Sequence, residues 1–333
     1  MSSSPTVSVI MPVYNVERFV VQAICSVLDQ TFGDSELIVV DDAGSDNSIA
    51  LCEVLADHRT RIVRQANRGL AGARNTGIAA ARGEFIALLD SDDAWTLTKL
   101  EQHVAHLHAN PEVGVSYAGS ILIDEDGHQI GIRQRPRVGP ATARHVFCGQ
   151  TVQNGSVPVF RRAALEDAAI RPTGTDRVWY FDESLRRSED VECWARIALT
   201  TKWRFEGLPG ATTLYRVNNG GLSADVIRQL ESWERVYEKI SAYAPDFIAR
   251  HGAEARAREL RYLARRAFQI GDRGLVLRLA IDAVRAWPKL LIAEPRKTLT
   301  TLAACTLLRF LPDRPFQIVA RAFGAPTVMR GAL

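Results

Sequence analysis

The sequence predicts an α/β fold with a mostly parallel sheet flanked by helices, followed by a C-terminal extension that is all helical. Three short apolar runs each end in polar or acidic residues, and helix-like stretches separate them. Such runs are typical of strands buried on both faces, and their alternation with helices favours parallel pairing with right-handed crossovers. The charge then changes sign along the chain, which separates an acidic domain over residues 1–225 from a basic one over 226–333.

Strands and helices are expected to alternate through the first part of the chain. The predicted strands are residues 7–11, 37–40 and 85–89, and the predicted helices are 16–30, 48–57 and one from about residue 97. Apolar residues at helical spacing support the helices. The glycine-rich segment 67–77 leads into a further helix that ends at Gly83.

Polar side chains follow each predicted strand. The first strand is followed by Pro12, Val13, Tyr14 and Asn15, the second by Asp41 and Asp42, and the third by Asp90, Asp92 and Asp93. In open α/β sheets, ligands bind beyond the carboxyl ends of the strands. These side chains are therefore candidates for one ligand site.

The acids after the third strand predict a divalent cation. Three carboxylates within four residues repel one another unless a cation lies between them, and phosphates would complete its coordination. Oxygen ligands favour magnesium or manganese over zinc. The alternative is a solvated acidic loop in which Asp93 caps the following helix.

The glycine-rich segment 67–77 is a second candidate for ligand contact. Small residues let the backbone approach a ligand, and Arg74 offers a fork of donors for an anion or a base edge. The alternative is a tightly packed helix. The phosphate-binding patterns of dinucleotide oxidoreductases and P-loop NTPases are missing from the sequence.

Four segments, in this order and spacing, resemble the family 2 glycosyltransferases. They read VSVIMPVYN, ELIVVDD, NRGLAGARNTG and LLDSDD, and the resemblance continues through residues 181–194 to Tyr215, Arg216 and residues 222–223. It covers about two thirds of the chain. It implies a GT-A, Rossmann-like catalytic domain with a nucleotide-sugar donor, for which a UDP-sugar is expected.

The resemblance also implies which residues bind the donor. The nucleotide would be held by Pro12, Val13, Tyr14, Asp41 and Arg74. Asp90 would face the ribose, and Asp92 would bind the Mn²⁺ or Mg²⁺ ion that bridges the phosphates. Many relatives complete this metal shell with a histidine, where this sequence has Asn218. Because an amide is a weaker ligand, a non-catalytic nucleotide-sugar-binding or scaffold homologue stays an alternative.

Glu189 and Asp190 occupy the acid pair of the family, which implies an inverting displacement with Asp190 as the base. Glu189 and Trp194 are candidates for the acceptor side, where a glycan or a lipid-linked glycan would bind. The region 119–160, including the loop 153–156, is also expected there. Alternatively, residues 188–190 only cap a helix over 191–198, and Trp194 only packs in the core.

Residues 226–333 carry 19 Lys and Arg against 10 Asp and Glu, a net charge of +9. Because the whole chain carries +3, residues 1–225 carry −6. Helices are expected over residues 226–243, 253–271, 274–287 and 295–311, broken by proline and glycine residues that include Pro245 and Gly252.

Basic helices suggest an anionic surface as partner. The apolar stretch 298–308 is too short to span a bilayer, so it either contacts a membrane surface peripherally or packs as an ordinary bundle helix. No nucleic-acid recognition motif accompanies the charge. Five scattered cysteines and a short polar N-terminus without a visible signal peptide lead us to expect a cytoplasmic protein, peripheral to the inner face of the membrane.

Overall fold

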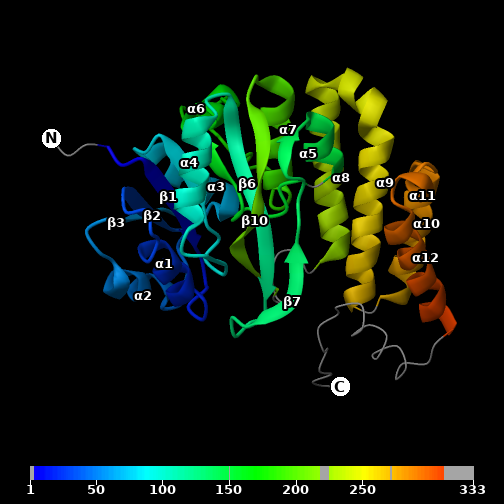
Figure 1. The fold of residues 1–333 in the computed structure, drawn as a ribbon, viewed down its shortest axis with the longest axis horizontal. Helices are drawn as coiled ribbons and strands as arrows, with labels where there is room; N and C mark the ends of the chain where they lie inside the picture. Colours follow the sequence, from blue (N-terminus) through cyan, green and yellow to red (C-terminus); the bar gives the residue numbers. More distant parts are fainter. Residues whose placement is uncertain (1–3, 150, 218–224, 271, 311–333) are drawn as a thin grey trace. The chain divides into compact units, whose positions relative to one another are not determined.

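The computed structural model describes residues 4–149, 151–217, 225–270 and 272–310 (Figure 1). The chain divides into two compact units, the first ending at Gly221 and the second beginning at Leu222. The units are considered separately below.

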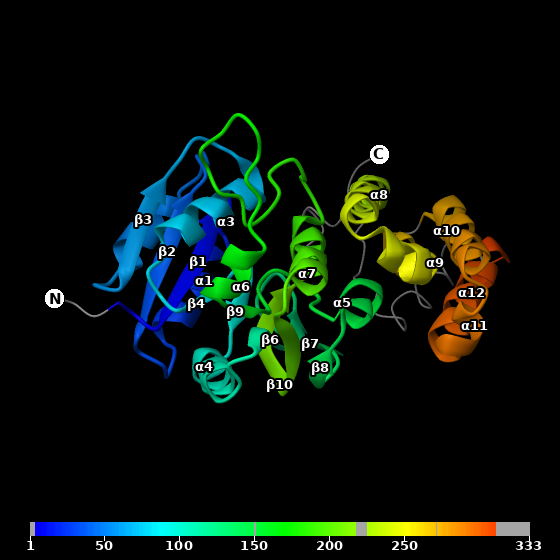
Figure 2. The ribbon, with the colours of Figure 1, turned by 90° about the horizontal axis from the view of Figure 1, so that it is seen from above.

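A ten-stranded sheet forms the centre of the first unit (Figures 1 and 2). Its strands are β1 (Val7–Val13), β2 (Ser35–Asp41), β3 (Thr60–Arg64), β4 (Phe85–Leu88), β5 (Ala94–Trp95), β6 (Val113–Ile123), β7 (Gln129–Gln134), β8 (Gly139–Ala141), β9 (Val159–Arg161) and β10 (Arg204–Arg216). The strand order is β3-β2-β1-β4-β9-β6-β10-β5, with β7 beside β6 and β8 beside β10.

Parallel pairing brings the ends of the predicted strands together. Strands β3, β2, β1 and β4 are parallel to one another, with Val13 opposite Asp41 and Ile10 opposite Leu88. The segments that follow β1, β2 and β4 therefore leave the sheet at one edge. Beyond β4 the sheet is mixed, since β9 is antiparallel to both β4 and β6 whereas β6 and β10 are parallel. The predicted α/β class with a mostly parallel sheet is confirmed.

Helices cover both faces of this sheet (Figure 2). They are α1 (Val20–Leu28), α2 (Ser48–Leu55), α3 (Gly69–Ala80), α4 (Lys99–Ala109), α5 (Ala143–Gly149), α6 (Arg162–Asp167) and α7 (Glu189–Thr200). Consecutive residues of a strand point to opposite faces. Ile10 accordingly joins one apolar core with Trp194, while Val9 and Met11 join a second core with Ile24. Covering on both faces explains why these strands are continuously apolar.

The start of the first helix differs from the prediction because of contacts with a distant segment. Helix α1 begins at Val20 and not at residue 16, because the Val16 N–H donates to Ser48 Oγ and the Glu17 N–H donates to Asp46 Oδ2, both at 2.9 Å. These bonds join the chain to the loop after β2 before the helix starts.

The predicted capping role of Asp93 is wrong. Helix α4 begins at Lys99 with Thr98 at its N-cap, and Asp93 is buried several residues earlier. Its carboxylate accepts hydrogen bonds from Ser156 Oγ at 2.6 Å and from the Arg216 N–H at 2.8 Å. Asp93 therefore connects the segment after β4 to two remote parts of the chain.

The second unit is helical throughout its described residues. It contains α8 (Val226–Tyr243), α9 (Pro245–Ile270), α10 (Arg273–Ala286), α11 (Leu290–Ala293) and α12 (Pro295–Phe310). The predicted break at Gly252 is wrong, because α9 starts at Pro245 and runs through that glycine. A Cβ at residue 252 would overlap the Tyr237 hydroxyl, so the glycine permits close contact between α8 and α9. Proline at a first helical position leaves no hydrogen bond unmade.

Every third residue of α12 from Thr298 to Ala304 is buried. Thr298, Thr301 and Ala304 lie in the core of the unit, whereas Leu299 is exposed. Within the described residues, this is the packing of an ordinary bundle helix. None of the described helices combines the length and the apolar character needed to cross a bilayer.

Candidate active site

The loops that follow β1 and β2 are joined at the edge of the sheet. Tyr14 directly follows β1 and is 50% exposed. Asn15 Oδ1 accepts a hydrogen bond from the Ser45 N–H at 2.7 Å. Asn15 and Ala43 adopt positive φ angles of 52° and 59°, a conformation that is unusual for residues other than glycine. This backbone presents the Tyr14 ring at the surface beside the end of β2.

Asp41 and Asp42 have different roles. Asp42 is buried and accepts hydrogen bonds from the N–H groups of Arg68 and Gly69, at 2.8 and 2.9 Å, where α3 begins. Burial raises its pKa. Asp41 is half-buried and accepts the Ala43 N–H at 3.0 Å. Asp42 therefore stabilises the start of α3, and Asp41 is the carboxylate closer to solvent.

Asp90, Asp92 and Asp93, the acid motif, leave the end of β4 with different surroundings. Asp90 and Asp92 are half-buried, whereas Asp93 is buried. Asp90 Oδ1 accepts from Arg74 Nη2 at 2.6 Å. Burial, together with the nearby charges of Asp92 and Asp90, raises the pKa of Asp93 well above its usual range. The motif thus has one interior member and two members at the edge of the sheet.

Ser156 joins the two ends of this motif. Its hydroxyl donates to Asp93 Oδ2 at 2.6 Å and accepts the Asp90 N–H at 3.0 Å. Asn154, Gly155 and Ser156 are all buried. Ser156 therefore supports the acid motif, and the expected place of the loop 153–156 on the acceptor side stays a prediction.

Arg216, at the end of β10, holds the acid motif from another side. Its Nε donates to the main-chain oxygen of Asp92 at 2.7 Å. Its Nη1 donates to the main-chain oxygens of Asp124 and Glu125, at 2.6 and 3.0 Å, and its Nη2 donates to Gln22 Oε1. The resemblance to the family included Arg216 only as one of its last matching residues. The sequence did not predict that Arg216 supports the acid motif.

The first turn of α7 carries the predicted acid pair. Glu189 is buried and accepts from Arg74 Nη1 at 2.8 Å, while Asp190 is half-buried. Burial raises the pKa of Glu189 to about 7 and also raises that of Asp190, although the positive charge of Arg74 opposes both shifts. Ser188 at the N-cap has a positive φ of 58° and makes no side-chain capping bond. Backbone strain of this kind is common at functional sites.

Trp194 packs in the interior, which is the alternative that the sequence left open. Its ring stacks on Phe160 with centroids 5.1 Å apart and meets the edge of Phe181 at 5.7 Å. The side chain belongs to the same apolar core as Ile10. Nothing in these contacts places it at a surface that an acceptor could reach.

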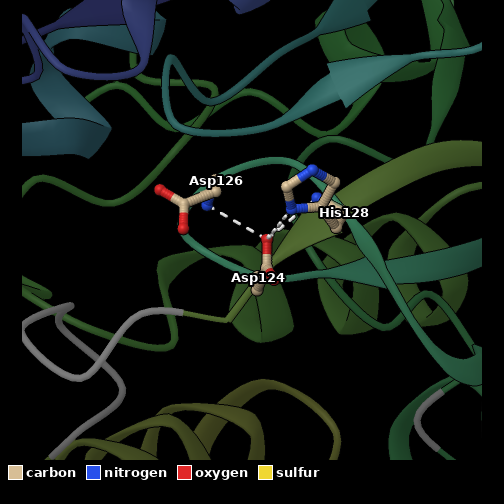
Figure 3. A group of neighbouring side chains, drawn as sticks. All are labelled: Asp124, Asp126 and His128. Carbon is tan, nitrogen blue, oxygen red and sulfur yellow. Dashed lines mark hydrogen bonds and ion pairs between the residues drawn. The ribbon is translucent and has the colours of Figure 1, made fainter.

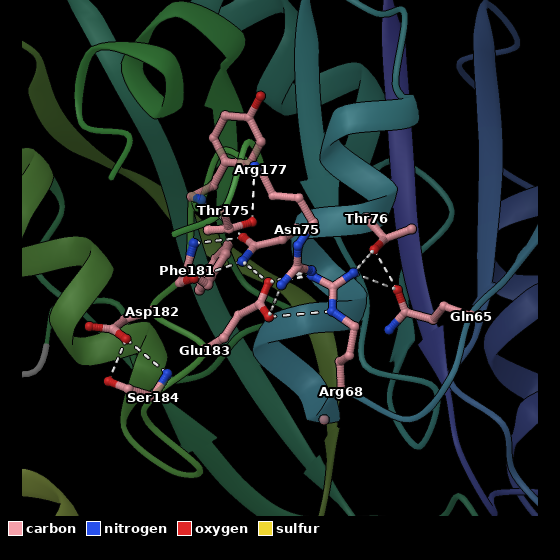
Figure 4. Close-up of polar contacts among 12 residues, drawn as sticks. Gln65, Arg68, Asn75, Thr76, Thr175, Arg177, Phe181, Asp182, Glu183 and Ser184 are labelled. Atoms are coloured by element: carbon pink, nitrogen blue, oxygen red, sulfur yellow. Dashed lines mark hydrogen bonds and ion pairs between the residues drawn. The ribbon is translucent and has the colours of Figure 1, made fainter. Parts of the chain in front are cut away.

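The segment before α7 is fixed to α3 by polar contacts (Figure 4). Arg68 forms an ion pair with Glu183. Asn75 Nδ2 donates to the main-chain oxygen of Phe181 at 2.8 Å and to Glu183 Oε1 at 3.0 Å. Asn75 Oδ1 accepts the Phe181 N–H at 2.8 Å. Helix α3 therefore positions both the acid motif, through Arg74, and the segment that leads to Asp190.

A group of potential metal ligands other than the predicted one lies in the turn that Arg216 joins to the acid motif (Figure 3). Ligand atoms of Asp124, Asp126 and His128 lie within 4.8 Å of one another in the turn between β6 and β7. Asp124 Oδ1 accepts the N–H groups of Asp126 and His128, at 3.0 and 2.8 Å, so this carboxylate folds the turn. Asn218, the other predicted ligand, lies outside the described residues.

Comparisons with known proteins define the class. Residues 8–168 match the model of glycosyl transferase family 2. An uncharacterized glycosyltransferase of Nostoc sp. is 31% identical over 277 residues, which cover 79% of this chain and 83% of that protein. The succinoglycan biosynthesis protein ExoO of Rhizobium meliloti is 29% identical over 284 residues, covering 82% of this chain and 76% of ExoO.

Solved structures support the fold. S. aureus TarS 1–349 in complex with UDP-GlcNAc superimposes with a TM-score of 0.62 at 20% identity, covering 91% of both chains. The mannosyltransferase PcManGT of Pyrobaculum calidifontis, in complex with GDP-Man and Mn²⁺, gives 0.58 at 20% identity, covering 96% of this chain and 84% of that one. The sheet, the strand-end acids and these similarities together define a glycosyltransferase with the GT-A fold. The chain belongs to glycosyl transferase family 2 and is a transferase enzyme.

Proposed function

We propose that this enzyme moves a sugar from a nucleotide-sugar donor, expected to be a UDP-sugar, to a glycan or lipid-linked glycan with inversion at the anomeric carbon. The observation that carries the proposal is the link from Asp90 through Arg74 to Glu189, which brings the acid motif and the first turn of α7 to one edge of the sheet. One relative of partial coverage supports the donor and acceptor classes. The E. coli protein WfgD is described as a UDP-Glc:α-D-GlcNAc-diphosphoundecaprenol β-1,3-glucosyltransferase, and it is 44% identical over 105 residues, 31% of this chain and 42% of WfgD.

The donor nucleotide is assigned to the segments after β1 and β2. Pro12 and Val13 end β1, and the half-exposed ring of Tyr14 is available to stack on a base. Asp41 offers a half-buried carboxylate beside them for a base or ribose hydrogen bond. The complexes of TarS with UDP-GlcNAc and of PcManGT with GDP-Man support a nucleotide sugar as the donor class.

The acid motif fits a hard divalent cation. Its donor atoms are carboxylate oxygens, which suit Mn²⁺ or Mg²⁺. The resemblance to the family assigns Asp92 as the residue that holds the ion, with Asn218 as a weaker candidate. Asp93 is buried against Ser156, and Asp90 is bonded to Arg74. When bound, the ion would stabilise the negative charge that develops on the departing nucleoside diphosphate. The Mn²⁺ named in the PcManGT complex is consistent with this assignment.

Asp190 is assigned as the base. As the acceptor hydroxyl attacks the anomeric carbon opposite the leaving group, the carboxylate takes the hydroxyl proton. Partial burial raises the pKa of Asp190, which brings a carboxylate closer to the proton affinity that a base needs near neutral pH. Its position in the first turn of α7 holds the side chain on a rigid element.

Residues 226–333 are proposed to form a separate basic helical domain that contacts the cytoplasmic face of a membrane peripherally. Ile292 is 83% and Leu299 57% exposed. The exposed basic residues Lys289, Arg296 and Lys297 lie near them in the sequence. Apolar side chains among basic ones suit an anionic lipid surface.

Nucleotide release from a panel of UDP-, GDP- and dTDP-sugars, with and without Mn²⁺, tests the donor and metal assignments. We expect one donor to turn over only with metal, and Asp92→Asn to abolish the metal response. Asp126→Asn is the matched control, because it removes an exposed carboxylate from the group of Asp124, Asp126 and His128. Metal-dependent turnover that survives Asp92→Asn and is lost in Asp126→Asn would contradict the assignment of the ion.

A further inference from the structure

Arg74 is an interior residue with both arms of its guanidinium engaged. Its side chain is 1% exposed. Nη2 donates to Asp90 Oδ1 at 2.6 Å and Nη1 donates to Glu189 Oε1 at 2.8 Å. The first carboxylate follows β4 and the second begins α7, so one side chain on α3 joins two segments that lie 99 positions apart in the sequence.

Packing fixes the guanidinium in this orientation. The Phe181 ring lies 5.2 Å from its central carbon. On another side, a Cβ added to Gly155 would overlap Nη2 and would lie 2.9 Å from Asp90 Oδ2. The guanidinium therefore has little room to rotate toward a ligand. The expected contact of Arg74 with the nucleotide stays a prediction, and this geometry favours a different role.

We propose that Arg74 is a positioning residue that couples the two halves of the reaction, because it holds the donor-side Asp90 and the base-side Glu189 in one unit. A forked, permanently charged guanidinium suits this task, because an ammonium offers no rigid fork that spans two carboxylates. The inference rests on the proposed function, in which Asp190 is the base.

The charges around Asp190 determine whether each substitution should raise or lower its pKa. Asp190 is faced by Arg74 from α3, by Asp90 from the segment after β4, and by Glu189 and Cys193 from its own helix. Burial raises the pKa of Asp190 and the charge of Arg74 lowers it. Removing the arginine should therefore raise the pKa of Asp190 further. Neutralising Asp90 should lower it, because a negative neighbour is lost and the charge of Arg74 is less compensated.

A carbon-13 NMR titration of the aspartate carboxyl groups in the full chain tests these signs without a substrate. The Asp190 signal is assigned by its loss in Asp190→Asn. We expect Arg74→Gln to raise the pKa of Asp190 and Asp90→Asn to lower it. The matched control is Arg68→Gln, which breaks the ion pair of another arginine of the α3 region with Glu183 and should leave the titration of Asp190 unchanged.

Kinetics supplies the second readout, with nucleotide release measured on the donor that turns over in the panel. Arg74→Lys keeps the charge and loses the fork, so we expect a fall in kcat of about 10- to 100-fold with little change in the titration of Asp190. An unchanged pKa of Asp190 in both Arg74→Gln and Asp90→Asn would overturn the inference. If Arg74→Gln fails to fold, a pKa of Asp190 in Asp90→Asn that is unchanged or raised overturns it alone. Failure of the proposed function is a separate result, namely full turnover by Asp190→Asn.

Discussion

At the scale of single residues, a site residue could be predicted when a local sequence pattern marks it, but not when its partner lies far away in the sequence. Asp41 and Asp90 end apolar runs, so a local pattern places them at the edge of the sheet. Ser156, in the loop before β9, and Arg216, at the end of β10, contact the acid motif although they lie 63 and 123 positions from Asp93 in the sequence. No local pattern marks such partners, because their role arises only when distant strands pair. Arg74 was singled out as a fork for an anion, but its partners are carboxylates of the chain itself.

The hydroxyl of Ser156 should contribute measurably to stability. Ser156→Ala leaves the Asp93 carboxylate and the Asp90 N–H each without one partner in the interior. We expect the free energy of unfolding in urea to fall by about 1–3 kcal/mol. Thr31→Ala is the control, because its hydroxyl donates to Glu101 Oε2 at 2.9 Å between two exposed residues, and its cost should stay within about 0.5 kcal/mol. Equal costs for the two variants would contradict the role of Ser156.

At the scale of elements, the strands were predicted better than the helix ends. The continuous apolar runs place β1, β2 and β4 to within two or three residues, because burial on both faces leaves little choice of residue. The start of α1 and the continuity of α9 through Gly252 were predicted wrongly. Both depend on tertiary contacts, with Ser48 in one case and Tyr237 in the other. The three-residue strand β9 gave too short a pattern to be recognised.

Glycines in two helices should respond oppositely to alanine. A Cβ at Gly77 of α3 would overlap Ile10 and lie 3.1 Å from Val40, so Gly77→Ala should lower the free energy of unfolding by about 1–3 kcal/mol. At Gly274 of α10 the nearest atom, from Asp272, is 3.8 Å away. Gly274→Ala should therefore stabilise the chain by up to about 1 kcal/mol through helix propensity. Urea denaturation measures the free energy of unfolding of both variants. A result in which Gly274→Ala destabilises the chain and Gly77→Ala does not would contradict this account of α3 packing.

At the scale of the whole molecule, the net charge changes from −6 over residues 1–225 to +9 over residues 226–333, and the chain divides into two compact units between Gly221 and Leu222. The assignment of a catalytic domain and a basic helical domain to these parts stays a prediction. The change in net charge along the sequence predicts this division, because it reflects a change in the side chains that each unit exposes at its surface. Composition cannot report the partner of the basic unit. Its exposed apolar side chains are identifiable only once the buried faces of its helices are known.

The full chain should bind anionic vesicles. We expect co-flotation with liposomes that contain phosphatidylglycerol, weakened by salt, and little with phosphatidylcholine alone. Ile292→Asp should reduce binding several-fold. Val54→Asp is the matched control, since Val54 has the same 83% exposure but lies on α2 of the acidic unit. Binding that is equal for both lipids, or lost equally in both variants, would count against the membrane contact.

The most direct test of the central claim compares nucleotide release by the wild-type enzyme and by Asp190→Asn, at saturating donor with Mn²⁺ and with crude cell glycans as acceptor. Asparagine keeps the shape of the side chain and removes the base. We predict a rate lower by about 10²–10⁴-fold, with the Kd for the donor nucleotide nearly unchanged. A variant that releases nucleotide at the wild-type rate would show that Asp190 is not the base of this glycosyltransferase.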